Sequence, residues 1–435
     1  MPTAAAVEEP PPAAGPTGRV DRAVALARNP RVVALVDQAV VSGTNFVTGW
    51  ALMRLVGETG MGVYTLAMTL VIVGVGMQTE LVTNPFKVYG QSKRGNTLRR
   101  YAGSAVIHQA VCSGLLLLLL VGAAGAAGQL DKLSSILPAL LVFGPMVMAR
   151  EFVRQMSFAA FRFDEALRSD AIVSSWQILS IALLWAAGRL SAPAVLATYG
   201  AGCGLSVYVW YVRSRDRFRY DRRMVLRHLS RNWRFARWTL ATFLVGSTTP
   251  FVMPWVLAAY HGEDATGLLA ACNALIGLSY MFTTGIANWL TAGSARAYVQ
   301  GGRAELMRVV WQTTGIMMLG LLPFVGLVWC CGEEILTFVY GDRVEGLGRV
   351  SFVIACGMLA VATNIVTGNA LWAIDRPQDG LKADVSVFAA TVALAVWLVP
   401  GHSVMGAAVA TALGVTLGAV VRTLSLIAAL RRAER

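Results

Sequence analysis

Long apolar runs separated by short polar segments make up most of the chain from residue 33 onwards. Each run is 18 to 28 residues long, and a helix needs about 20 residues to cross the apolar core of a bilayer. A transmembrane β-barrel would instead show short segments of alternating polarity. The pattern predicts an all-α integral membrane protein with twelve transmembrane helices, at residues 33–56, 61–86, 101–128, 133–158, 171–188, 192–212, 238–260, 265–292, 309–330, 350–373, 383–400 and 404–428.

Basic residues are strongly biased toward alternate connecting segments. Lys and Arg collect on the cytoplasmic side of membrane proteins. If the N-terminus lies inside, the inner segments hold 31 basic residues and the outer segments hold 5. An error in the number of spans would exchange inner and outer segments beyond that point and would remove this bias. The charges therefore predict that both termini are cytoplasmic.

Composition agrees with a membrane protein and explains the net charge. The chain is 56% hydrophobic and 14% charged, which is too apolar for an ordinary soluble domain. Its net charge is +13, and ten arginines lie in segment 213–237 alone. Because this segment joins the sixth and seventh predicted spans on the inner side, topology and anionic headgroups account for it. We therefore predict no nucleic-acid partner.

No sequence pattern points to a metal, a cofactor or a catalytic centre. All six cysteines lie in or at the ends of apolar spans, and no CxxC or CxxH spacing occurs. Metal sites usually show such spacings. The polar segments carry no constellation of carboxylates that resembles an active site. We expect no cofactor, no metal and no enzymatic activity.

The second half of the chain repeats part of the first at an offset of 205 residues. Residues 46–62 read FVTGWALMRLVGETGMG and residues 251–267 read FVMPWVLAAYHGEDATG, with seven identical positions. Each stretch covers the outer half of an odd-numbered span and the turn that follows it. Because six spans separate the copies, both have the same orientation across the membrane, which is a parallel repeat.

The repeat predicts two six-helix lobes around a central cavity. We expect a disordered or amphipathic cytoplasmic N-terminus (1–32), an N-lobe (33–212), a basic cytoplasmic linker (213–237), a C-lobe (238–430) and a short cytoplasmic tail (431–435). The inner hairpins 161–170 and 373–384 fall at matching places in the two lobes. Lobes of this kind expose a central site to each side in turn by rocking, so the architecture favours a transporter.

Two hairpins resemble a known family. Two regions of the chain are similar to polysaccharide transporters. The first, within 37–67, contains DQAVVSGTNF and MRLVGETGMGVYTLA, and the second, within 262–302, contains GEDATGLLAACNAL and FTTGIANWLTAGSARAYVQGG. These transporters are the O-antigen and exopolysaccharide flippases of the multidrug/oligosaccharidyl-lipid/polysaccharide (MOP) flippase superfamily. The resemblance implies a bacterial inner-membrane flippase that moves polyprenyl-diphosphate-linked oligosaccharide from the inner to the outer leaflet. It also implies lipopolysaccharide or exopolysaccharide biosynthesis, with a polymerase and glycosyltransferases as possible partners beside the substrate and membrane lipids.

Polar side chains inside spans are costly in lipid and are candidates for the substrate pathway. By analogy with the superfamily, the first, second, seventh and eighth spans face the cavity. The candidates there are Asp37, Asn45, Arg54, Gln78, Glu80, Asn273 and Asn288. A second tier, outside these spans, comprises His108, Asn364, Asn369 and Arg422.

Each candidate also has a purely structural interpretation. Arg54 and Arg422 could extend to lipid headgroups, and Asp37 could pair with Arg31 or Lys87. The asparagines could bond neighbouring helices, Glu80 could pair with Arg99 or Arg100, and His108 could be a packed polar residue. These alternatives stay open at the level of sequence.

The seventh span departs from what the resemblance implies. It contains Pro250 and Pro254 and no charge, so we expect a kink that could serve gating and weak ion coupling there. Two other functions compete with the flippase. One is a Na⁺- or H⁺-coupled multidrug or cation efflux antiporter of the same superfamily, which should hold an acid at mid-depth. The other is a membrane-embedded enzyme of polysaccharide biosynthesis.

Overall fold

The computed structural model describes residues 30–432 except 91–92, 161, 247–248 and 375, and all of its regular structure there is helical. The N-lobe contains α2 (Pro30–Ala51), η1 (Leu52–Val56), α3 (Glu58–Gln78), η2 (Thr79–Thr83), α4 (Asn84–Gly90), α5 (Gly95–Ala126), η3 (Asp131–Leu133), α6 (Leu137–Ala159), α7 (Phe163–Ala186) and α8 (Ala192–Ser214). The remaining elements are η4 (Arg215–Arg217), α9 (Arg222–Gly246), α10 (Thr249–Tyr340), η5 (Asp342–Val344), α11 (Gly348–Ala373) and α12 (Pro377–Arg432).

The two longest helices are interrupted where the chain reverses direction. The backbone is non-helical at Gly262 (φ 83°) and Gly302 (φ 60°) in α10, and at Ser403 (φ 47°) in α12. Glycine adopts positive φ without steric cost, so the first two breaks are built into the sequence. Counted with these breaks, the described helices make twelve passes, as predicted. Seven of the described helices are long and apolar enough to cross a membrane, and the chain is a multi-pass membrane protein.

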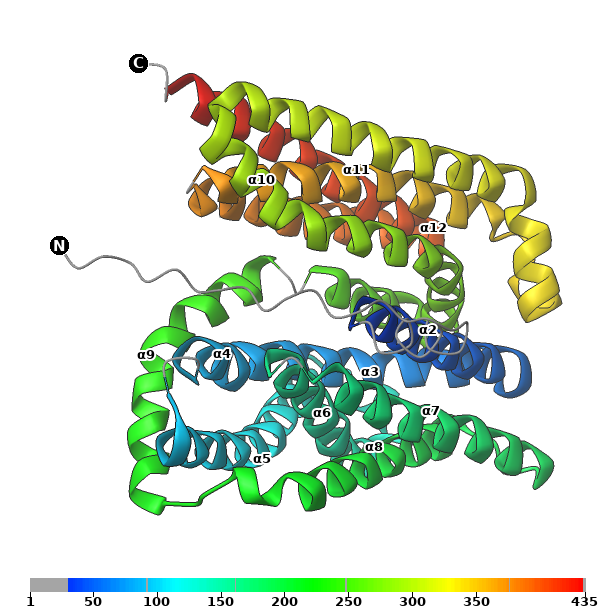
Figure 1. The fold of residues 1–435 in the computed structure, drawn as a ribbon. Helices are drawn as coiled ribbons and strands as arrows, with labels where there is room; N and C mark the ends of the chain where they lie inside the picture. The colour runs from blue at the N-terminus through cyan, green and yellow to red at the C-terminus, as the bar shows by residue number, and fades with distance from the viewer. Residues whose placement is uncertain (1–29, 91–92, 161, 247–248, 375, 433–435) are drawn as a thin grey trace, which may run out of the picture.

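The passes form two bundles that run side by side (Figure 1). Helices α2–α8 form the N-lobe, α10–α12 form the C-lobe, and α9 connects the bundles at one end. The largest apolar core crosses the boundary between them, since it includes Leu52 and Met53 of the first lobe and Leu257 and Ile276 of the second. A separate core lies wholly within the C-lobe around Leu290, Met317 and Leu371. The predicted parallel two-lobe fold is confirmed.

The basic segment between the lobes is mostly helical. Helix α9 begins at Arg222, inside the segment predicted as a linker, and continues to Gly246. The predicted span 238–260 is thus divided between α9 and the start of α10, and the described helices stop on either side of 247–248. Pro250 is at the start of α10 and Pro254 lies within it. The predicted N-terminal segment 1–29 and the final residues 433–435 lie outside the described part of the chain.

Candidate functional site

The two copies of the sequence repeat contact each other where the lobes meet. A Cβ atom added to Gly62 would lie 1.8 Å from the carbonyl oxygen of Glu263, and one added to Gly267 would lie 2.1 Å from that of Glu58. Adding 205 to 62 gives 267 and subtracting 205 from 263 gives 58, so the repeat exchanges the first pair of residues with the second. The contact is therefore isologous, as in a two-fold dimer, and it leaves no room for a side chain at either glycine.

A hydrogen bond lies close to the pseudo-two-fold axis of this contact. The hydroxyl of Thr59 donates to the carboxylate of Asp264, and these two residues are themselves equivalent in the repeat. Beside them, Lys132 Nζ lies 3.5 Å from Glu263 Oε1. We call residues 57–62 and 262–267 the paired turns. They join the lobes at the end predicted to face outside.

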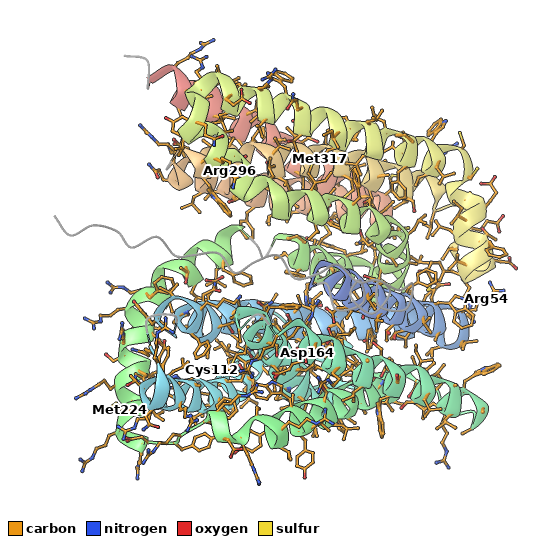
Figure 2. The ribbon with its side chains drawn as sticks, viewed as in Figure 1. Arg54, Cys112, Asp164, Met224, Arg296 and Met317 are labelled. Atoms are coloured by element: carbon orange, nitrogen blue, oxygen red, sulfur yellow. The ribbon has the colours of Figure 1, made fainter. Side chains whose placement is uncertain are left out.

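Two arginines add contacts between the lobes at the same end of the molecule. Arg54 lies at the tip of the N-lobe that the segment around Gly341 approaches (Figure 2), and a Cβ on Gly341 would be 2.9 Å from Arg54 Nη1. Arg343 of the C-lobe donates to the carbonyl oxygen of Met53 at 3.4 Å. Arg54 is in the π-helical segment η1 and remains exposed. Such segments within helices are frequently found at functional sites.

A network of buried charges lies within the N-lobe. Asp37 of α2 accepts a hydrogen bond from Arg154 of α6 at 3.0 Å. The Nε atom of Arg154 lies 3.0 Å from the carboxylate of Asp170 in α7, which also pairs with Arg150. Glu151 lies 3.4 Å from Arg150. The network connects three helices. Asp37 pairs with Arg154 and Lys87 bonds Gln155, so the predicted pair of Asp37 with Lys87 is not formed among the described residues, and the side chain of Arg31 lies outside them.

The network extends to the second predicted span. Gln155 donates to Glu151 at 3.1 Å and accepts from Lys87 at 2.7 Å. The network contains equal numbers of acidic and basic residues: Asp37, Glu151 and Asp170 on one side, and Lys87, Arg150 and Arg154 on the other. Buried charges are tolerated when they are paired and hydrogen-bonded, so this balance explains how six ionisable groups fit among apolar helices.

Gln78 and Glu80 each have a hydrogen-bond partner within the N-lobe. Gln78 is buried and donates to the carbonyl oxygen of Met148 at 3.2 Å. Glu80, in the π-helical segment η2, accepts from Asn84 at 2.9 Å rather than pairing with Arg99 or Arg100. The first contact joins α3 to α6, and the second joins residues four apart in one continuous stretch of helix.

The C-lobe holds a smaller polar centre. Arg422 of α12 pairs with the carboxylate of Asp384 and donates to the carbonyl oxygen of Asn364 at 3.1 Å. The Asn364 amide donates to Val415 O at 3.1 Å, and that of Asn369 donates to Ile365 O at 2.8 Å. Arg422 therefore bonds to neighbouring helices instead of extending to headgroups.

The remaining candidates are dispersed. Asn45 and Asn273 have exposed side chains on α2 and α10. His108 is buried, with its Nε2 atom 2.9 Å from the carbonyl oxygen of Val225 in α9. The side chain of Asn288 lies outside the described residues.

Helix α9 packs a polar face on the N-lobe and presents arginines on another. Asn232 accepts from the hydroxyl of Tyr101 at 2.8 Å, and His228 Nδ1 lies 2.9 Å from the hydroxyl of Ser104. Next to this contact is a cavity of about 550 Å³ lined by Tyr89, Arg231, Arg234, Phe235 and Thr239. The Arg231 guanidinium lies 4.1 Å from the centre of the Tyr89 ring. We call this the basic cavity; it lies at the end opposite the paired turns.

Sequence reasoning missed the centre of the buried network. The charge count places Arg150 and Arg154 with the inner connecting segments and does not consider Glu151 or Asp170. The side chains of Arg150 and Arg154 are only 7% and 16% exposed, and that of Asp170 is 0% exposed. One signal was present: Arg150 and Arg154 are four residues apart within a predicted span, so they share one helix face.

Comparison with known proteins gives the fold. No protein family model matches the sequence, and no curated protein matches it either. A structure of the lipid II flippase MurJ in an inward closed conformation superposes with a TM-score of 0.74, at 12% identity over 91% of this chain and 88% of that one. An inward-facing multidrug resistance MATE family transporter of the MOP superfamily matches with a TM-score of 0.66, at 14% identity over 95% and 99%.

A third match is a MOP superfamily transporter from Pyrococcus furiosus, with a TM-score of 0.61, 12% identity and coverage of 95% and 96%. The chain therefore has the MOP superfamily fold, as the sequence resemblance implied. Identity this low carries the fold alone, and the polysaccharide transporter family stays a prediction.

Proposed function

We propose that this protein is a flippase that moves polyprenyl-diphosphate-linked oligosaccharide from the inner to the outer leaflet by alternating access. One observation carries the proposal. The lobes are joined at the predicted outer end by the paired turns, while the opposite end holds the basic cavity with Arg231 and Arg234. This is the arrangement that would receive an anionic cargo from the cytoplasmic side.

The chemistry of the cargo matches this arrangement. Moving an unpaired charge into hydrocarbon costs tens of kcal/mol by Born estimates. Arg231 and Arg234 can bind a diphosphate through charge-assisted hydrogen bonds, and Tyr89 and Phe235 offer apolar surface beside them. A potential that is negative inside would favour outward movement of an anion by about 2.3 kcal/mol per charge per 100 mV.

The candidate pathway residues separate into two groups under this proposal. Asn45, Arg54 and Asn273 are exposed and available to sugar hydroxyls or phosphate. The other described candidates are bonded inside the protein. Bonds to other helices, which would position those helices, are made by Asp37, Gln78, His108, Asn364 and Arg422. Glu80 and Asn369 bond residues four positions away along the helix. Asn288 remains a pathway candidate from the sequence alone.

The cellular setting is part of the proposal. We place the protein in the bacterial inner membrane with cytoplasmic termini, where O-antigen or exopolysaccharide units would reach it from glycosyltransferases and pass to a polymerase. The similarity to a lipid II flippase supports a lipid-linked cargo.

A liposome assay tests the proposal directly. The full chain is reconstituted with a fluorescent polyprenyl-diphosphate oligosaccharide, and dithionite bleaches only the probe in the outer leaflet. We expect loss of the protected inner pool. Because one arginine near a membrane surface contributes about 1 kcal/mol toward an anion, Arg231→Gln with Arg234→Gln should slow flipping at least about fivefold.

The matched control is Arg223→Gln, which removes an exposed charge from the same helix outside the basic cavity. Arg54→Ala should reduce export in cells without lowering the protein level, and unchanged export would remove it from the pathway. Bleaching no faster than in empty liposomes would overturn the flippase proposal.

The antiporter alternative has one observation against it. The acid in the first span, Asp37, is already paired with Arg154, so it is less available to a transported cation. Uptake of an organic cation driven by a Na⁺ or H⁺ gradient in the same liposomes would favour the antiporter over the flippase.

A further inference from the structure

A second polar region lies at the ends of the N-lobe helices, on the side away from the C-lobe. A cavity of about 280 Å³ is enclosed by residues of α4, the first turns of α5 and α7, the ends of α6 and α8, and η4 with the residue after it. Its wall is mainly apolar, with Phe86, Leu98, Ala102, Met156 and Phe218 among its residues. No residue of α2 or of α10–α12 is among those that line it, so it is separate from the boundary between the lobes.

Arginines surround this lateral cavity. Arg217 donates to both carboxylate oxygens of Glu165, at 2.9 and 3.0 Å, and Arg162 donates to the same carboxylate at 3.2 Å. Arg99 also lines the cavity and is exposed. Three arginines and one glutamate leave two formal positive charges in excess. The site therefore combines an apolar interior with a cationic rim.

A neighbouring cavity shares part of the same wall. It has a volume of about 130 Å³ and is lined by Glu165, Trp210 and Arg217 together with Arg168, Arg213 and others. The indole Nε1 of Trp210 is buried and has no hydrogen-bond acceptor among the described residues. Buried donors are normally satisfied, and a phosphate or ester oxygen beside Trp210 would supply the missing acceptor.

The surroundings fit the membrane interface. Tyr208, Tyr211 and Tyr220 have exposed side chains close to this end of α8. Tyrosine and tryptophan are enriched where a membrane protein meets the headgroup region. Basic pockets between transmembrane helices on the cytoplasmic side bind anionic lipid headgroups.

We infer that the lateral cavity binds one anionic phospholipid of the inner leaflet, with its phosphate on Arg99, Arg162 and Arg217 and part of an acyl chain against Ala102 and Met156. The excess positive charge selects the headgroup, and the apolar wall selects a lipid over a soluble anion. This site is independent of the transported cargo, and it would tie the ends of α5, α6 and α8 to the bilayer surface.

Native mass spectrometry of the full chain in detergent tests the inference. Titration with phosphatidylglycerol should show one tightly held lipid, and phosphatidylcholine should bind at least about fivefold more weakly. Arg99→Gln should weaken phosphatidylglycerol binding about fivefold, because each surface arginine contributes about that factor toward an anionic lipid. Arg223→Gln, which removes an equal charge from α9, should leave it unchanged.

A second variant separates the lipid from a free anion. Ala102→Leu fills the apolar wall without changing charge, so it should also weaken phosphatidylglycerol binding, while the melting temperature of the lipid-free protein shows whether the fold is intact. Inorganic phosphate at millimolar concentration should not displace the lipid. Equal binding of both lipids, equal effects of Arg99→Gln and Arg223→Gln, or displacement by phosphate would each overturn the inference.

Discussion

The two lobes carry an aspartate at matching places, and it is buried in the N-lobe but partly exposed in the C-lobe. Asp170 and Asp384 each end one of the matching inner hairpins, 161–170 and 373–384. Asp170 is 0% exposed and pairs with Arg150 and Arg154. The Asp384 side chain is 29% exposed, and Arg422 is its one ion-pair partner within the described part of the chain.

The arginines come from different passes in the two lobes. Each lobe has an aspartate–arginine pair that joins helices near one end of the bundle, but the arginines lie on the fourth pass in the N-lobe and on the twelfth pass, the counterpart of the sixth, in the C-lobe. The N-lobe extended its pair into a charge-balanced network across α2, α6 and α7, whereas Asp384 lies against Gly246 at the end of α9, where an added Cβ would be 3.2 Å from its Oδ2 atom. We expect loss of one charge to destabilise the N-lobe strongly, and we expect the C-lobe pair to be sensitive to changes in the connection between the lobes.

The largest expected effect comes from neutralising Asp170. Asp170→Asn leaves two buried arginines short of a partner, and breaking a buried pair costs about 3–5 kcal/mol. Asp384→Asn should cost less, because water reaches this pair. Unfolding by heat or denaturant in detergent measures both, and equal losses would contradict the contrast between the lobes.

In contrast to the two aspartates, the two paired turns should respond equally to the same substitution. Gly62→Ala and Gly267→Ala each force a side chain against a carbonyl oxygen, and overpacking of this kind costs about 1–3 kcal/mol. The ratio of molecules that are closed at the paired turns to molecules that are open there should fall by roughly 5- to 150-fold in both variants. Spin labels at positions 189 and 345, on exposed residues of the two lobes, report the separation.

Gly277→Ala is the control for these variants, since a Cβ at Gly277 would contact nothing within 4 Å. A large effect of one turn variant beside a small effect of the other would show that the contact is not symmetric in energy.

A smaller effect is expected from the bond between the turns. Thr59→Val removes the donor to Asp264, and a hydrogen bond to a charged group contributes about 1.5–3 kcal/mol before solvent exposure reduces it. Both residues are exposed, so we expect a loss of about 1 kcal/mol or less, read from the same label distances. A shift as large as that of Gly62→Ala would mean that the bond, rather than the close backbone approach, holds the lobes together.

The smallest effect concerns the contact between α9 and the N-lobe. Burial, followed by the nearby Lys93, His108, Arg231 and Arg227, lowers the pKa of His228 below its usual value. The unfolded chain therefore takes up a proton first as pH falls, so stability should be full above about pH 6.5 and decline below it. Thermal unfolding between pH 7.5 and 5.5 measures this decline.

His228→Gln should flatten that pH dependence, whereas His261→Gln in the C-lobe should retain it. An unchanged slope in His228→Gln would place the pH dependence elsewhere. The pair of variants asks whether the pH sensitivity belongs to one lobe only, as the packing of His228 on Ser104 and Tyr101 suggests.

The sequence predicts the fold well because its signals are local. Span length, the bias of basic residues and the repeat around Gly57 and Gly262 each follow from a short stretch of chain. The kink expected at Pro250 and Pro254 stays a prediction, because residues 247–248 lie outside the described part of the chain.

The candidate site was predicted less completely because it depends on which helices are neighbours. Asp37 is a pathway candidate from the sequence, but its partner Arg154 is 117 residues away. The rule that ionisable residues in spans mark function also selected Gln78, Asn364 and Arg422, whose contacts hold helices together. Without pairing information, a polar residue that binds cargo and one that bonds a neighbouring helix look alike.

The pairing of Thr59 with Asp264 carries a consequence for the ancestry of the chain. In a dimer of two identical six-pass halves, the same position would face itself, and two aspartates there would repel while two threonines would lack the carboxylate acceptor. Only after fusion could one copy become the donor and the other the acceptor. The unlike residues at this point mark an advantage that a single gene encoding both halves has over an assembly of identical subunits.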